Sequence, residues 1–275
     1  MCRLNYRERR EEHGKSGDGV GRDEAHSMKM RVRDPGRVDP HSMGRWRAGA
    51  LLWITLCIPS MIMSTRSTTL VELLDAIVAD EAKAVRLVRA TPKIAQARVA
   101  ADRLVEDVPH QLYVGDTALH LAAAALRPLA VGALIEAGAD SNAENRRGAT
   151  ALHYACDARP KAGKTWNPSK QRSVIELLLD AGSDIEHKDK AGAAPLHRAV
   201  RARNPQAVRC LLERGARVDA THGRQRTTPL HIVTHSTGAG GTKGARAEQQ
   251  EIVEVLLQYG ADPRARDAYG NLPRI

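Results

Sequence analysis

Four similar ten-residue segments recur from residue 116 onward, and they limit the fold more than any other feature of the chain. The segments are DTALHLAAAA from 116, ATALHYACDA from 149, AAPLHRAVRA from 193 and TTPLHIVTHS from 227. Their histidines are separated by 33, 44 and 34 residues. Units of this size cannot bury their apolar side chains alone, so consecutive units must stack on one another. The histidines are His120, His153, His197 and His231.

Each segment is followed by an amphipathic second helix that ends at a glycine. From histidine to glycine the count is 18, 29, 18 and 29 residues, so two units carry an insertion of 11 residues. These insertions fall within 157–171 and 235–250, between the two predicted helices of a unit. In three units a threonine is placed to cap the first helix, and in all four the glycine supplies the left-handed conformation that ends the second. These positions are Thr117, Thr150, Thr228, Gly138, Gly182, Gly215 and Gly260.

The T-P-L-H-x-A core at this period resembles the ankyrin-repeat superfamily, and the resemblance covers about residues 67–275. Within that superfamily the chain is similar to bacterial proteins in which a helical lead-in precedes GDTALHLAAA. The resemblance implies an all-α solenoid of helix–turn–helix units with β-turn fingers, a helical N-terminal cap and a truncated fifth repeat. It also implies a non-catalytic scaffold for a protein partner, in which the repeat histidines tie adjacent turns together through backbone groups.

Residues 1–66 differ in composition from the rest and are interpreted as a disordered or non-native leader. They contain an apolar run over 48–63 that is short for a spanning helix and is interrupted by Pro59, so no stable membrane span is expected. Three origins are open: an upstream false start of translation, a signal or anchor over 43–63, or a genuine tail. We expect a cytoplasmic protein, with export or membrane anchoring as the alternative if 43–63 acts as a signal.

The rest of the chain divides into a helical cap over 67–110 and a repeat domain over 111–275. Helical spacing predicts a third cap helix over 93–105, after two helices that begin near Thr69 and Asp80. Only DAYGNLPRI follows the fourth repeat, so we expect its apolar face to lack a cover and to fray or self-associate. That face consists of Val253, Leu256 and Leu257.

Catalytic groups, cofactors and metal sites are not predicted. The four cysteines form no close pair, which excludes a disulfide scaffold and a CxxC zinc site. His153 and Cys156 share a helix, but no third group orients them and Cys156 holds a core position of the motif. The segment ARPKAGKT over 158–165 fits a loose Walker A form, yet a helix rather than a strand precedes it. A nucleotide-hydrolysing enzyme that uses Lys164 is therefore disfavoured.

The charge pattern indicates where a partner binds. The net charge is +10 and many cations fall in the predicted fingers, which favours an acidic protein segment as the ligand. The alternative is a polyanion, either nucleic acid or anionic lipid, although no aromatic platform for bases accompanies the arginines. Trp166 and Lys164 on the first insertion form a second candidate site at the opposite edge. The candidate finger contacts are Asn142, Asn145, Arg146, Arg147, His187, Lys188, Lys190, His222, Arg224, Arg226, Arg264, Arg266 and Tyr269.

Overall fold

The computed structural model describes residues 69–105, 108, 110–158, 167–234 and 245–275. The predicted leader over 1–66 lies outside the described residues, as do Lys164, Trp166 and most of each insertion. The α-helices of the described chain are α1 (Leu70–Ala79), α2 (Glu81–Ala90), α3 (Ala118–Ala124), α4 (Pro128–Glu136), α5 (Ala151–Asp157), α6 (Pro168–Asp180), α7 (Pro195–Arg201), α8 (Pro205–Glu213), α9 (Pro229–Thr234) and α10 (Arg246–Gln258).

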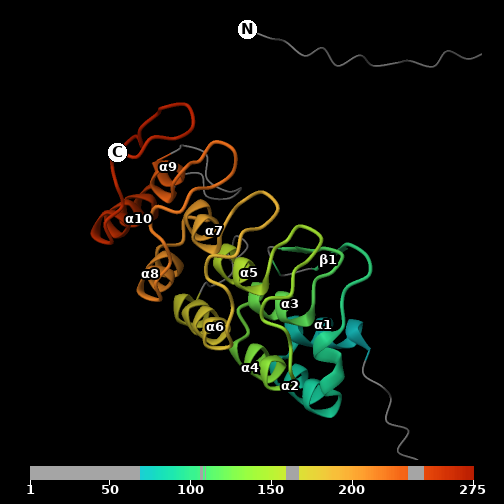
Figure 1. Cartoon of the computed structure of the whole chain (residues 1–275). Coiled ribbons are helices and arrows are strands. Elements are labelled where there is room, and N and C mark those ends of the chain that lie inside the picture. Colours follow the sequence, from blue (N-terminus) through green and yellow to red (C-terminus); the bar gives the residue numbers. More distant parts are fainter. Residues whose placement is uncertain (1–68, 106–107, 109, 159–166, 235–244) are drawn as a thin grey trace, which may run out of the picture. The chain divides into compact units, whose positions relative to one another are not determined.

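Within residues 69–275 the repeats stack side by side in two layers of helices (Figure 1). The first helices of the repeats, α3, α5, α7 and α9, contact one another in sequence order and are called the inner layer here. The second helices, α4, α6, α8 and α10, form the outer layer in the same order. In the cap, α1 packs on α3 and α2 packs on α4, so the cap continues both layers. The prediction of an all-α solenoid is confirmed.

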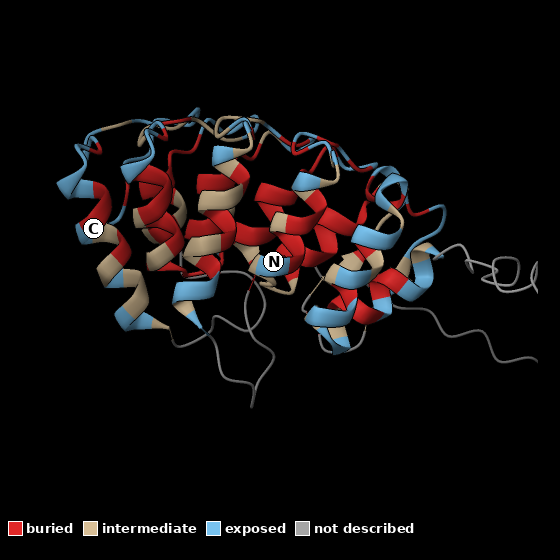
Figure 2. Cartoon of the chain, turned by 90° about the horizontal axis from the view of Figure 1, so that it is seen from below, coloured by how far each residue is buried: buried red, intermediate tan, exposed pale blue. Residues whose placement is uncertain are grey.

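Leucine and alanine fill the space between the layers. The leucine that precedes each repeat histidine is at most 1% exposed, as Leu119 and Leu230 illustrate. The small side chains of Ala122, Ala155 and Ala199 are fully buried, which lets neighbouring inner helices approach closely. Figure 2 shows buried residues along the helices and exposed residues concentrated at the helix ends and on the finger loops. The core therefore needs few aromatic rings, in keeping with an aromatic content of 3%.

The outer helices end at the predicted glycines. Gly138 has φ +83°, its N–H donates to Ile135 O, and the next N–H, of Ala139, donates to Leu134 O. This pattern satisfies carbonyl groups that the end of a helix leaves free, and it requires a left-handed residue. Equivalent φ values of +84°, +90° and +86° occur at Gly182, Gly215 and Gly260.

The two insertions lengthen the outer helices of their repeats. Helices α6 and α10 have 13 residues each, whereas α4 and α8 have nine, a difference of four residues or about one turn. The side chain of Asn167 caps the extended start of α6 by accepting from the N–H of Lys170 at 3.1 Å. About a third of each insertion is thus helix that projects beyond the ends of α4 and α8.

One inner helix lacks the threonine cap that the others have. Thr117, Thr150 and Thr228 each place a hydroxyl 2.8–3.0 Å from the ring of their repeat histidine, at the start of its helix. Ala194 occupies this position before α7. We expect Ala194→Thr to raise the free energy of unfolding by about 1 kcal/mol in urea denaturation. The same gain in Ala194→Val, which has the shape of threonine without its oxygen, would contradict this explanation.

The predicted third cap helix over 93–105 is wrong. A 3₁₀ helix, η1 (Pro92–Gln96), is followed by extended chain and by the hairpin of β1 (Arg103–Leu104) and β2 (Gln111–Leu112), in which Arg103 lies opposite Leu112. The N–H of Val99 donates to Asp116 O at 2.7 Å, and the N–H of Gly115 donates to Val99 O at 2.9 Å. These long-range bonds use the backbone that a helix would need. Local spacing alone does not reveal them.

The prediction for the face of the fourth repeat is partly wrong. Leu256 is fully buried and Val253 is half-buried, whereas Leu257 is 38% exposed. The segment after α10 returns to α9, where Asn271 O accepts from the ring of His231 at 3.1 Å and Pro273 is buried. Self-association through the remaining apolar residues stays a prediction, which sedimentation over a range of protein concentrations tests.

Candidate protein-binding surface

The repeat histidines connect neighbouring repeats through hydrogen bonds. In each, Nδ1 accepts from the backbone N–H at the start of its own helix, so the proton resides on Nε2 and is donated to a carbonyl of the next finger. His120 reaches Ala149 O at 3.1 Å, and His153 reaches Ala193 O at 3.0 Å. Within the described ranges, no cluster of histidine, cysteine and acidic side chains is placed to hold a metal ion. Both ring nitrogens are therefore engaged in folding.

Cys156 is unsuited to nucleophilic chemistry. It is fully buried in α5, and burial raises the pKa of its thiol well above the usual value. A protonated thiol without solvent access cannot attack a substrate. Most of the Walker-like segment, residues 159–165, lies outside the described residues, and the element before it is the helix α5.

The N-terminal cap covers part of the inner layer. The described residues of 98–112 (98–105, 108 and 110–112), called the cap hairpin here, lie beside α3 and α5 (Figure 1). The ring of His110 packs 4.8 Å from the ring of Tyr154 on α5, and Leu112 is fully buried. Tyr154 is 2% exposed, whereas Ile232, at the equivalent position of α9, is half-buried. The inner surface of the first two repeats is thus occupied by the chain itself.

A buried polar network explains why one candidate contact residue is unavailable. Asn145 is 5% exposed, and its amide donates to Asp116 at 2.9 Å and to the hydroxyl of Tyr154 at 3.1 Å. The Tyr154 hydroxyl donates in turn to Asp116 at 2.8 Å. Burial, followed by the charge of Asp116, raises the pKa of Tyr154, so the phenol stays protonated as a donor. We therefore place Asn145 in the fold and not on the docking surface.

The finger loops between the repeats are named by their residues. We call residues 139–149 finger 2, 183–193 finger 3, 216–227 finger 4 and 261–271 finger 5.

Other candidate residues on finger 2 are held by neighbouring groups. Asn142 donates to Gly182 O at 2.9 Å and accepts from the N–H of Asp184 at 2.8 Å. Arg146 is paired with Asp102 of the cap hairpin, and the guanidinium of Arg147 lies 4.2 Å from the centre of the Tyr113 ring. Finger 2 is thus braced against the cap hairpin on one side and finger 3 on the other.

The two finger histidines pack against repeat histidines. The His187 ring lies 5.8 Å from that of His153, and its Nε2 is 3.2 Å from Gly148 O and 3.4 Å from Glu144. The His222 ring lies 5.4 Å from that of His197. Both rings are half-buried, so their edges alone are available to a partner.

Finger 4 differs from its neighbours by one residue. In fingers 2, 3 and 5, an Asn or Asp side chain closes a five-residue loop by accepting two backbone N–H groups, as Asp189 does from Ala191 and Ala193 at 2.9 Å each. In finger 4 the loop runs from His222 to Thr227, six residues joined by a pair of backbone hydrogen bonds. This extra residue accounts for the 34-residue interval in the sequence, and it leaves residues 223–226 exposed at the tip.

Arg226 has the backbone conformation of a glycine. Its φ is +51°, and it stands five residues before the repeat histidine, where the other repeats have glycine. We expect Arg226→Gly to raise the free energy of unfolding by about 1 kcal/mol in urea denaturation, because a left-handed non-glycine residue is strained. Arg224→Gly is the matched control, since it removes the same charge from a residue without a positive φ. An equal gain from both variants would assign the effect to charge.

The junction between fingers 3 and 4 is open. A backbone hydrogen bond joins the tips at the other junctions: Arg146 donates to Val114 O, Lys190 to Arg147 O and Ala268 to Gln225 O. Among the described residues, no backbone hydrogen bond joins fingers 3 and 4. The ammonium of Lys188 instead donates to Thr221 O at 3.3 Å. The fingers also approach at their glycines, where a side chain on Gly192 would lie 3.1 Å from Gly223 N.

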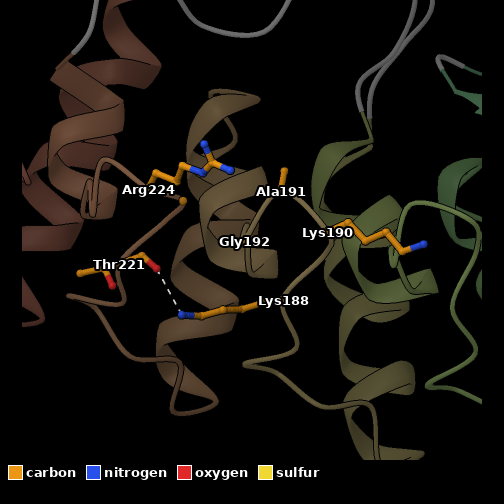
Figure 3. Close-up of a pocket in the computed structure, with 7 residues that line it drawn as sticks. Lys188, Lys190, Ala191, Gly192, Thr221 and Arg224 are labelled. Atoms are coloured by element: carbon orange, nitrogen blue, oxygen red, sulfur yellow. Dashed lines mark hydrogen bonds between the residues drawn. The ribbon is translucent and has the colours of Figure 1, made fainter.

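This open junction forms a cationic groove of about 530 Å³, which we call the finger groove. Its lining comes from both fingers, and Figure 3 shows the Arg224 guanidinium directed toward the Ala191 side of the groove and the Lys190 side chain directed away from Arg224. The lining residues are Lys188, Lys190, Ala191, Gly192, Thr221, Gly223 and Arg224.

The comparisons with known proteins agree with this geometry. A sequence model of three ankyrin repeats matches residues 167–267, and a model of a single ankyrin repeat matches residues 114–146. The chain belongs to the ankyrin-repeat superfamily. Ankyrin repeats generally mediate protein–protein interaction and are generally not enzymatic.

Two relatives of known description cover only parts of the chain. An ankyrin repeat protein of Pyrobaculum aerophilum is 40% identical over 68 residues, which are 25% of this chain and 20% of that protein. The B-cell lymphoma 3 protein homolog of Mus musculus is 32% identical over 151 residues, 54% of this chain and 30% of that protein. The ankyrin domain described here thus spans less than a third of each relative. One relative is archaeal and one is from mouse, so the expected bacterial origin stays a prediction.

None of the helices in the described part of the chain combines the length and the apolar content that crossing a bilayer requires.

Proposed function

We propose that this ankyrin-repeat protein is a non-catalytic scaffold that binds a protein partner through fingers 3, 4 and 5 and the inner helices of repeats 3 and 4. The observation that carries the proposal is the difference between the two halves of the inner surface. The cap hairpin occupies the first half, and the finger groove opens in the second. A rigid surface loses little conformational entropy when it binds. Little of the binding free energy is therefore offset by the ordering of loops.

The candidate residues of the second half are exposed. Lys188, Lys190, Arg224 and Arg226 lie on fingers 3 and 4. On finger 5, Arg264 and Arg266 are exposed, and Tyr269 is 73% exposed. An exposed tyrosine among arginines is a common composition for a binding surface, because both residue types make large contacts. We infer that these residues contact the partner, whereas Asn142, Asn145, Arg146 and Arg147 support the fold.

The test is affinity capture with the full chain from a lysate of its own host cells, treated with nuclease and washed at moderate salt. We expect a discrete protein to be retained, because a docked protein surface is less sensitive to salt than phosphate contacts are. Recovery of nucleic acid that disappears with nuclease, or of material that a moderate salt wash removes completely, would favour a polyanion as the ligand and contradict the proposal.

A further inference from the structure

The finger groove differs from the other finger junctions of the described chain in its backbone hydrogen bonds. It is the junction where the backbone hydrogen bond between tips is missing and where the six-residue loop of finger 4 begins. We propose that the finger groove binds an extended acidic segment of the protein partner, with carboxylates of that segment paired to Lys190 and Arg224. This inference rests on the proposed function.

The cations of the groove lack acidic partners of their own. Within the described residues, Lys188, Lys190 and Arg224 form no ion pair, and all three are exposed. Nearby carboxylates are already used: Asp189 is paired with Arg198 at 2.6 Å, and Glu186 accepts from the N–H of Arg217 at 2.8 Å. The positive charge of the groove is therefore available to a ligand.

The directions of the side chains indicate the length of the ligand. The Lys190 side chain on finger 3 extends away from Arg224 on finger 4 (Figure 3), so a ligand that pairs with both must be extended. A peptide with two or more carboxylates can pair with both and lie across the glycines between them. Gly192 and Gly223 line this middle part of the groove and leave the backbone accessible.

The lining also separates an acidic peptide from a nucleic acid. Single-stranded nucleic acids bind by stacking bases on aromatic rings, and none of the seven lining residues is aromatic. Asp184, which is exposed, and Asp219, which is half-buried, lie on the same two fingers and would repel a continuous line of phosphates. A protein segment whose carboxylates are spaced apart fits this surface of mixed charge better than a nucleic acid does.

The experiment measures fluorescence anisotropy of a labelled twelve-residue peptide of alternating Glu and Ser during titration with the full chain. The same peptide with Gln in place of Glu is the ligand control. We expect Lys190→Glu combined with Arg224→Glu to weaken binding of the Glu peptide by at least about tenfold. Arg264→Glu combined with Arg266→Glu on finger 5 changes the net charge equally and is expected to weaken it less than about threefold. Circular dichroism melting checks that both variants fold.

Three results would overturn the inference: equal loss in the two variants, equal affinity for the Glu and Gln peptides, or tighter binding of a single-stranded oligonucleotide of the same charge. The proposed function is tested separately by affinity capture with the groove variant. Retained capture together with lost peptide binding would leave the scaffold function intact and move the docking site away from the groove. Loss of both, with peptide binding by the finger 5 variant retained, is the expected outcome.

Discussion

Replacing Arg198 with alanine is expected to lower the free energy of unfolding by about 4 kcal/mol. The guanidinium of Arg198 on α7 lies 2.6 Å from Asp189 and 3.2 Å from Asp157, and thus joins finger 3 to the end of α5. The side chains of Asp189 and Asp157 are only 4% and 13% exposed. Without the arginine, two largely buried carboxylates would lose their main cationic partner. The cost of keeping these charges out of water would then lower the free energy of unfolding.

The control is Arg201→Ala, which removes the same charge from the same helix. Arg201 pairs with Asp157 at 3.5 Å, and its side chain is 46% exposed, so we expect a loss of less than about 1 kcal/mol. Urea denaturation of both variants at neutral pH measures the difference. Equal losses would contradict the view that the buried cluster, and not net charge, joins these repeats.

Acidification from pH 7 to pH 5 is expected to lower the free energy of unfolding by about 4 kcal/mol through two repeat histidines. Burial and the nearby Arg198 lower the pKa of His153 to about 4, and burial lowers that of His197 to about 4. An unfolded histidine has a pKa near 6.5, so between pH 6.5 and 4 the unfolded chain binds protons that the folded chain does not. Stability therefore falls as the pH falls through this window, by about 2 kcal/mol for each ring at pH 5.

The structural cause is the direction of the hydrogen bond at Nδ1. In His197, Nδ1 accepts from the N–H of Ala194. A proton on Nδ1 would replace this acceptor with a second N–H donor, and the hydrogen bond would be lost. Urea denaturation between pH 7.5 and 4.5 measures the slope. His197→Gln should be less stable at pH 7 and should show a shallower slope, by about 2 kcal/mol between pH 7 and 5. An unchanged slope would show that other groups carry the pH dependence.

Asp189 adds to the acid sensitivity at lower pH. Burial raises the pKa of this carboxyl, but hydrogen bonds from Arg198 and from the N–H of Ala193 outweigh burial and lower it below the usual value. A lowered acid pKa contributes stability above the unfolded value near 4, and this stability is lost as the pH falls below it. The two effects therefore follow one another, histidines first and Asp189 second.

The sequence was sufficient to predict the repeat fold because its evidence is local and repeated. The spacing of His120, His153 and His197, and a glycine after each outer helix, recur with few exceptions. The cap was predicted less well, since the backbone of Val99 pairs with Asp116, a partner 17 residues away that no local periodicity reveals. The same holds for the segment after α10, whose Asn271 O accepts from the ring of His231, 40 residues earlier.

The candidate contact surface was predicted only by composition, and composition does not distinguish exposed from buried polar groups. Asn145 and Arg224 both belong to polar finger sequences, yet Asn145 is in the core and Arg224 is at the surface. The one available signal was the 34-residue interval, which marks the extra residue of finger 4. Its consequence, an open junction with finger 3, depends on backbone hydrogen bonds that the interval alone does not specify.

Site-specific photo-crosslinking tests the central claim most directly. A benzophenone amino acid replaces Gln225 at the tip of finger 4 in one form of the full chain, and Leu129 on the outer helix α4 in another. Both positions are exposed, and Leu129 is 65% exposed. After irradiation in lysate of the host cells, we expect a discrete crosslinked protein from position 225 and none from position 129. The same crosslink from both positions, or a protein crosslinked only from position 129, would contradict the assignment of the partner to the fingers.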